Sequence, residues 1–180
     1  GTWVRCRVIG NNSYANGGSG IVFASGAFSA IDVTITGNTV RGNTFDGIQS
    51  DGIAPAVSQR ITITGNVARG NSQSGIYMAL VNDATVVGNE ILDNAVDGIV
   101  INQASRITVT GNNILNTGEV GFPTQRHGIY LQTDNINSSN ISLIGNIISS
   151  MGQRGIIVDN VTKTLTGVII QGNILTENTT

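Results

Sequence analysis

The chain of 180 residues has room for one domain, and only 11% of its residues are charged, with a formal net charge of −2. This balance offers no basic surface, which argues against nucleic acid and anionic membranes as partners. No run of 18 apolar residues occurs, so the sequence contains no candidate membrane-spanning helix. Its 24 glycines and its many Asn, Thr, Ile and Val residues favour strands and tight turns over helices.

Two dipeptides recur in order along the chain. A Gly-Asn pair begins at Gly10, Gly37, Gly65, Gly88, Gly111, Gly145 and Gly172. A Gly-Ile pair follows each of the first six, at Gly20, Gly47, Gly75, Gly98, Gly128 and Gly155. The tightest repeats are about 23 residues long, and the others carry insertions at two fixed places, which is typical of a solenoid.

Each repeat predicts three short strands. The first follows the Gly-Ile pair, as in Gly75–Met78; the second precedes Gly-Asn, as in Ile61–Thr64; the third is an apolar pair such as Ile91–Leu92. Alternation within the second strand predicts one buried and one exposed face. Stacked repeats would place two apolar columns inside: Val33, Ile61, Ala84, Ile107, Ile141 and Val168, then Ile35, Ile63, Val86, Val109, Leu143 and Ile170. We therefore predict an all-β fold, a right-handed parallel β-helix (a single-stranded solenoid) with three short strands per coil and about six to seven coils.

Three polar columns are predicted to serve this scaffold. The first holds the Asn of every Gly-Asn pair, since Asn tolerates a sharp bend and its amide can bond to the next coil. A second, partial Asn column contains Asn16, Asn43, Asn71, Asn94 and Asn178. The third alternates in charge, through Asp32, Arg60, Asp83 and Arg106, so neighbouring coils would form ion pairs.

The repeated Ile-Thr-Ile-Thr-Gly-Asn and Gly-Ile-x-apolar segments resemble those of the right-handed β-helix repeat family, the pectin-lyase-like superfamily, along essentially the whole chain. The resemblance implies a protein that acts on polysaccharide, since members include pectate and alginate lyases, polygalacturonases, uronan epimerases and bacteriophage spikes. The signatures of the individual subfamilies are missing. The sequence contains neither the Asn-Thr-Asp and Gly-His-Gly set of polygalacturonases, nor the Asp-Pro-His-Asp of mannuronan epimerases, nor the Arg-x-Pro-x-x-Arg of pectate lyases. The resemblance therefore carries over no catalytic residue.

Insertions indicate where the coil is elaborated for binding. Loops at about Asp51–Ser58 and Thr133–Ser139 would wall a groove over the third and fourth coils, and a further insertion lies within Thr117–Arg126. The outward positions of the Gly-Ile strands would form its floor. From these segments we predict the following residues to bind sugar: Asp51, Tyr77, Asn102, Gln132 and Glu119.

His127 is the only histidine, and it lies beside the insertion and close to Tyr130. This pair could remove a sugar C5 proton and protonate the leaving oxygen, as β-elimination requires, while Arg126 neutralises a uronate carboxylate. The alternative is a surface imidazole that anchors the inserted loop. Asp97 is a further catalytic candidate: with Asp46, about 10 Å away by strand spacing, it could form a glycosidase pair, or both could be turn residues.

The sequence predicts an enzyme module, a lyase or related depolymerase or epimerase, that acts on an acidic polysaccharide. The alternative is a non-catalytic structural or adhesion rod, such as a phage tail-spike segment that binds surface glycan. No metal-ligand spacing is present, so no cofactor is predicted, although clustered acids leave Ca²⁺ open. We expect residues 1–180 to be one domain of a longer chain, located extracellularly or on a virion surface. Flanking domains or a homo-oligomer would cover the coil ends, and phage spikes imply a trimer.

Overall fold

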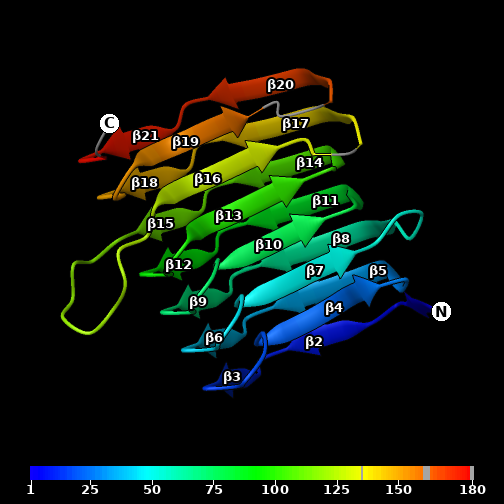
Figure 1. Ribbon diagram of the computed structural model, residues 1–180, viewed down its shortest axis with the longest axis horizontal. Helices are drawn as coiled ribbons and strands as arrows, with labels where there is room; N and C mark the ends of the chain where they lie inside the picture. The colour runs from blue at the N-terminus through cyan, green and yellow to red at the C-terminus, as the bar shows by residue number, and fades with distance from the viewer. Residues whose placement is uncertain (135, 160–162, 179–180) are drawn as a thin grey trace.

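The computed structural model describes residues 1–134, 136–159 and 163–178, and these residues form strands and turns without any helix. All paired strands are parallel and belong to three sheets, which wind around one another as successive coils of a right-handed β-helix (Figure 1). The fold predicted from the repeat is confirmed. In the described part of the chain no helix is long and apolar enough to cross a membrane.

The coils between the two ends each contribute one strand to each sheet, and at the N-terminal end two short strands share one neighbour in sheet A. Sheet A contains β1 (Thr2–Val4), β2 (Arg7–Ile9), β5 (Ser29–Thr36), β8 (Ser58–Thr64), β11 (Val81–Val87), β14 (Ser105–Thr110), β17 (Ser138–Ile144) and β20 (Leu165–Gln171). Sheet B contains β3 (Asn12–Tyr14), β6 (Thr39–Arg41), β9 (Val67–Arg69), β12 (Glu90–Leu92), β15 (Asn113–Leu115), β18 (Ile147–Ser149) and β21 (Ile174–Thr176). Sheet C contains β4 (Ile21–Gly26), β7 (Ile48–Gly52), β10 (Ile76–Ala79), β13 (Asp97–Asn102), β16 (His127–Gln132) and β19 (Arg154–Asp159).

The predicted inward columns lie in register on sheet A. Ile61 pairs with Ala84 and Ile63 with Val86, and the same register continues through the neighbouring coils. Ile35, Ile63, Val86 and Val109 are fully buried in a core that runs the length of the stack. Ile170, in the last strand of the sheet, is 48% exposed because no further strand of the described residues covers it on that side.

The predicted Asn column is a continuous ladder of hydrogen bonds. The side chain of Asn89, for example, accepts from the backbone and side-chain N–H groups of Asn66 at 2.9 and 3.0 Å. It donates to Asn112 at 2.9 Å and to the carbonyl of Ile63 at 3.1 Å. All the hydrogen-bonding groups of this buried amide are therefore satisfied, as an interior polar group requires.

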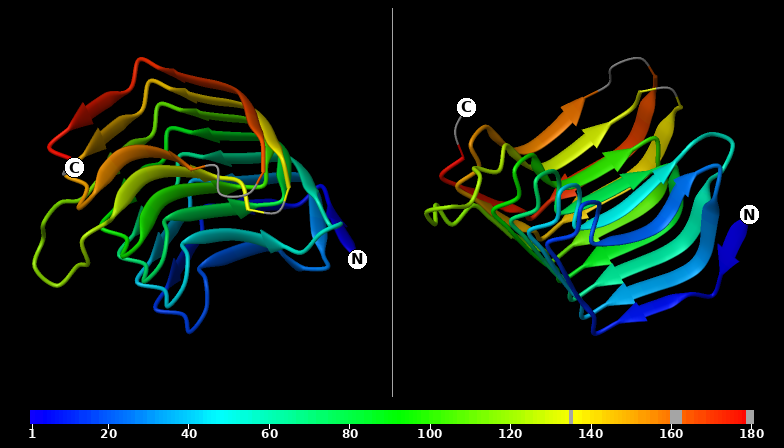
Figure 2. Two further views of the ribbon diagram at one scale, coloured as in Figure 1. Left: turned by 45° about the horizontal axis from the view of Figure 1, so that its top comes forward. Right: turned by 60° about the horizontal axis from the view of Figure 1, so that its bottom comes forward.

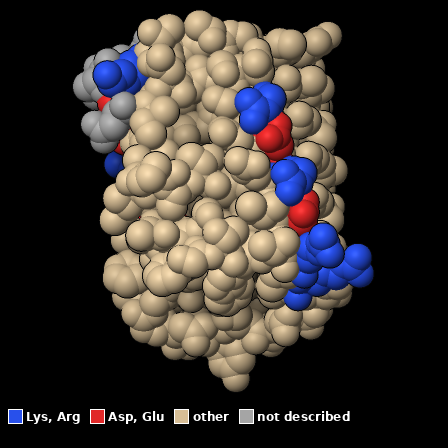
Figure 3. Space-filling model, turned by 90° about the vertical axis from the view of Figure 1, so that its right-hand side faces the viewer, with Lys and Arg blue, Asp and Glu red and all other residues tan. Residues whose placement is uncertain are grey.

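The alternating charged column runs along one corner of the coil (Figure 3). It forms separate pairs rather than a continuous chain: Arg60 binds Asp32, with the closest approach at 2.5 Å, and Arg106 binds Asp83 through its Nε and Nη2 atoms. Asp32, Arg60, Asp83 and Arg106 all have a positive φ of 55 to 58°, so the column also marks a bend of the backbone. Exposed pairs of this kind contribute little to stability.

The outer face of sheet C and the loops at its two ends define the region where chemistry was predicted. The strands of this sheet run side by side across one face of the molecule (Figures 1 and 2). The inserted segment between β15 and β16 projects from the ends at which the sheet C strands begin, beyond the body of the coil.

Candidate functional site

Parallel register brings the outward residues of sheet C into columns across the coils. Tyr77 pairs with Val100, which pairs with Tyr130, and Asn102 pairs with Gln132. At the start of the strands, Asp97 pairs with His127, and His127 with Arg154. Residues some 30 positions apart in the chain thus become neighbours on one face.

Asp97 and His127 form a hydrogen-bonded pair. The Nδ1 atom of His127 lies 2.7 Å from Oδ1 of Asp97, and the two side chains are 7% and 2% exposed. A carboxylate at Nδ1 favours, in a neutral imidazole, the tautomer that carries the proton on Nδ1 and a lone pair on Nε2. Orientation of an imidazole by a carboxylate in this way prepares its far nitrogen to accept a proton.

The far nitrogen of His127 has no hydrogen-bond partner in the part of the chain that the structure describes. Nε2 is buried and makes no hydrogen bond to any described residue. A buried polar atom without a partner costs free energy, and native structures contain few of them. The atom that general-base chemistry would use is therefore one of three buried side-chain atoms that have no hydrogen bond among the described residues.

Tyr130 and Arg126 complete the cluster. The rings of His127 and Tyr130 are 5.6 Å apart between centroids, and the Tyr130 hydroxyl donates to Asp159 at 3.1 Å. Desolvation, with the Asp159 contact second, raises the pKa of Tyr130, so the phenol stays protonated at neutral pH. Nη2 of Arg126 lies 3.4 Å from Oδ2 of Asp97, while the side chain remains 47% exposed. The four predicted catalytic residues are together in space, and their roles remain predictions.

Two of the predicted sugar-binding residues, Asn102 and Gln132, lie at the far end of the same face, where they meet a carboxylate that the sequence did not single out. Asn102 and Gln132 both donate to Asp134, at 2.9 and 3.2 Å. The side-chain amide oxygen of Asn102 is buried and has no hydrogen-bond partner among the described residues. Tyr77 lies in the middle of the sheet, in the same column as Tyr130. Burial raises the pKa of Tyr77, whose phenol stays neutral. Asp134 lies in an irregular loop. The only sequence signal for its contact with Asn102 and Gln132 was its position two residues after the end of β16.

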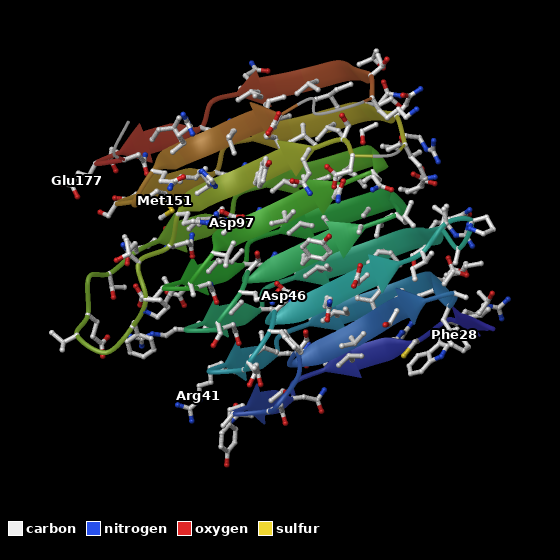
Figure 4. The ribbon with its side chains drawn as sticks, in the orientation of Figure 1. Phe28, Arg41, Asp46, Asp97, Met151 and Glu177 are labelled. Carbon is white, nitrogen blue, oxygen red and sulfur yellow. The ribbon has the colours of Figure 1, made fainter. Side chains whose placement is uncertain are left out.

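Asp51 and Asp46 also belong to this sheet. Asp51 is exposed, in register with Ala79 in the next coil. Asp46 lies just before β7, at the same end of the sheet as Asp97 (Figure 4), and is buried. Burial raises its pKa from 3.8 to about 6, and it accepts a hydrogen bond from the backbone of Ser74 at 2.8 Å. Ser74, of the intervening coil, separates Asp46 from Asp97, so the two carboxylates are two coils apart.

Glu119 lies elsewhere. Its carboxylate pairs with Arg69, which ends a strand of sheet B and not of sheet C. The structure therefore separates Glu119 from the other predicted sugar-binding residues. Among residues 1–134, 136–159 and 163–178 no group of three or more His, Cys, Asp or Glu side chains is arranged to hold a metal ion.

The chain matches a family model described as a right-handed β-helix region over residues 29–180. This match covers most of the chain, so the protein belongs to the right-handed β-helix family. No curated protein matches the sequence.

Solved structures share the fold at low identity. The A-module of the Azotobacter vinelandii mannuronan C-5 epimerase AlgE4 is 18% identical, with a TM-score of 0.59, over 96% of this chain and 55% of that one. A double mutant of the periplasmic alginate epimerase AlgG is 20% identical, with a TM-score of 0.55, over 87% and 47%. The Dettilon tailspike protein is 19% identical, with a TM-score of 0.48, over 90% and 30%. The chain thus spans about half the length of these epimerases, and the similarity establishes the fold alone.

Proposed function

We propose that this chain is a carbohydrate-active β-helix module that binds an acidic polysaccharide across the outer face of sheet C and removes the C5 proton of a uronate residue. The observation that carries the proposal is the buried Asp97–His127 pair, with its 2.7 Å hydrogen bond and an unpartnered Nε2. Two structural neighbours are a mannuronan C-5 epimerase and an alginate epimerase, which agrees with a uronate polymer as substrate.

In the proposed reaction, the bound substrate first displaces the side chains that cover Nε2 of His127. Nε2 then takes the C5 proton, and Asp97 stabilises the imidazolium that forms. In β-elimination the electron pair of the C5–H bond becomes the C4–C5 double bond, and the C4–O bond breaks. Tyr130, protonated at neutral pH, gives its proton to the leaving oxygen after the substrate displaces Asp159 from the hydroxyl. In epimerisation no bond to oxygen breaks, and a proton returns to C5 from the opposite side.

Arg126 supplies the positive charge that the reaction needs. Removal of a proton beside a carboxylate places negative charge on the carboxylate oxygens, and a guanidinium can hold both of them. Arg126 is half exposed and only one of its nitrogens approaches Asp97, so its other N–H groups are available to a uronate.

A non-catalytic glycan-binding or structural module is the second candidate, and the burial of His127 favours it. An imidazole that is 7% exposed and paired with Asp97 can simply anchor the start of β16 after the insertion. Under this alternative the protein binds polysaccharide without changing it, as an adhesion rod would.

Turnover separates the two candidates. The protein is incubated with polymannuronate, polyguluronate, polygalacturonate and a panel of bacterial capsular polysaccharides. Unsaturated ends are followed by ultraviolet absorbance, new reducing ends by a colorimetric assay, and C5 inversion by NMR. We expect one substrate to react with the wild type and not with His127→Gln, while Glu90→Gln, an exposed change on sheet B, reacts normally. Binding without any of the three products would favour the adhesion rod.

A further inference from the structure

A cavity of about 310 Å³ lies on the sheet B side of the coil, apart from the residues assigned above. It is lined by Tyr14, Ala15, Arg41, Gly42, Arg69 and Phe122. Tyr14, Arg41 and Arg69 are the last residues of three adjacent strands and stand in register. Phe122 comes from the inserted segment between β15 and β16 (Figure 1), and it lines the cavity beside Gly70, which directly follows β9.

The two arginines of the cavity each face an aromatic ring. The guanidinium carbon of Arg41 is 5.2 Å from the centre of the Tyr14 ring, and that of Arg69 is 4.4 Å from the centre of the Phe122 ring. Phe122 reaches this position because Gly70 has no side chain: a Cβ there would lie 2.6 Å from the ring. Cations over aromatic rings form a surface that can bind both a negatively charged group and the flat apolar face of a ligand.

Scaffolding does not explain this arrangement. On the opposite corner neighbouring coils place Arg60 beside Asp32 and Arg106 beside Asp83. Here Arg41 and Arg69 are neighbours in register, and like charges in adjacent strands are destabilising. Two cations held side by side need anions near them to offset their repulsion.

One of the two arginines is already neutralised and the other is not. Arg69 pairs with Glu119 of the inserted segment and lies 3.5 Å from Asp93. Arg41 is exposed (Figure 4) and forms no ion pair with any described residue. The cavity therefore offers one free guanidinium, and Glu119 occupies the place at Arg69 that a second carboxylate could take.

We propose that this cavity is a second saccharide-binding site that takes a uronate residue, with the carboxylate on Arg41 and a sugar face against the Tyr14 or Phe122 ring. Aromatic rings stack on the apolar faces of sugars, and a guanidinium holds a carboxylate with two parallel hydrogen bonds. The choice of an acidic sugar rests on the proposed function. A polymer that reaches both this cavity and sheet C would be held by two contacts, which raises its effective concentration at the reacting face.

The test uses amide NMR shifts of the ¹⁵N-labelled protein, titrated separately with sodium galacturonate, glucose and sodium sulfate. The amides of Gly42 and Gly70 report on the cavity, and those of Gly98 and Gly128 report on sheet C. We expect galacturonate, but neither glucose nor sulfate, to shift Gly42 and Gly70. Arg41→Gln should weaken this binding about tenfold, because a charge-assisted pair is lost from an exposed side chain. Glu119→Gln should tighten it severalfold by freeing Arg69.

Three results would overturn the second site. Shifts at Gly42 and Gly70 that Arg41→Gln leaves unchanged would reduce the cavity to an anchor for the inserted segment. Equal shifts with sulfate would make it a general anion site and not a saccharide site. Galacturonate shifts confined to Gly98 and Gly128 would support binding at sheet C and refute the second site. Shifts confined to Gly42 and Gly70 would support the second site and argue against binding at sheet C.

Discussion

Replacement of the buried carboxylate of Asp46 by an amide should stabilise the protein at neutral and alkaline pH. The folded pKa of Asp46 is about 6, against an ordinary value of 3.8, because burial disfavours the charged form. Since the folded state binds the Asp46 proton more tightly, the stability that this group contributes is fully present below pH 3.8 and is lost as the pH rises through 6. At about 1.4 kcal/mol for each pH unit, the difference corresponds to about 3 kcal/mol. Asn at this position keeps an oxygen for the Ser74 backbone and carries no charge.

The assay is urea unfolding of wild type and Asp46→Asn, followed by circular dichroism between pH 4 and pH 8. We expect the two proteins to unfold together near pH 4 and the variant to be more stable by about 3 kcal/mol at pH 8. Asp83→Asn is the matched control: the Arg106 contact lowers the pKa of Asp83, so this variant should change little and in the opposite direction. An advantage of Asp46→Asn that is the same at both ends of the pH range would refute burial of the charge as its cause.

Three further changes test the site and the stack. Asp97→Asn should lower turnover about a hundredfold or more with little change in KM, because an amide no longer fixes the His127 proton on Nδ1. Unchanged turnover would show that Asp97 has no part in the mechanism. Asn89→Leu should cost about 3 kcal/mol or more in urea unfolding, since it breaks the Asn ladder at its centre, and a loss below 1 kcal/mol would argue against the ladder. Gly128→Ala should unfold at least about 2 kcal/mol more easily, because its Cβ would lie 2.3 Å from Ile148, whereas Gly18→Ala, with open space around it, should not.

The stack was predictable from the sequence because every coil repeats the same physical requirement. Ile63 and Val86 must both be apolar to share the core, and Asn66 and Asn89 must both be amides to bond to one another. The second Asn ladder was found only in part. Gln125 takes the ladder position of the fifth coil, at 3.4 Å from Asn94, but the insertion before it hides the alignment.

The site was predictable only where it follows the repeat. Asp97 and His127 occupy equivalent positions of adjacent coils, so the register alone brings them together. Register does not reveal the direction of an inserted loop. Glu119 was expected near the sugar-binding face, but its segment folds back toward sheet B, because Arg69 offers a cation and Gly70 leaves room for Phe122.

Proton removal at C5 by His127 is the step on which the proposed function depends, and solvent-deuterium exchange measures it directly. A uronate polymer that binds the protein is incubated in D₂O, and the C5 position is followed by NMR. With the wild type we expect either deuterium at C5 or loss of the C5 proton together with the formation of unsaturated ends. With His127→Gln we expect neither. Exchange that persists in His127→Gln would contradict the assignment of the base. A polymer that binds the wild type and shows neither change would contradict catalysis itself.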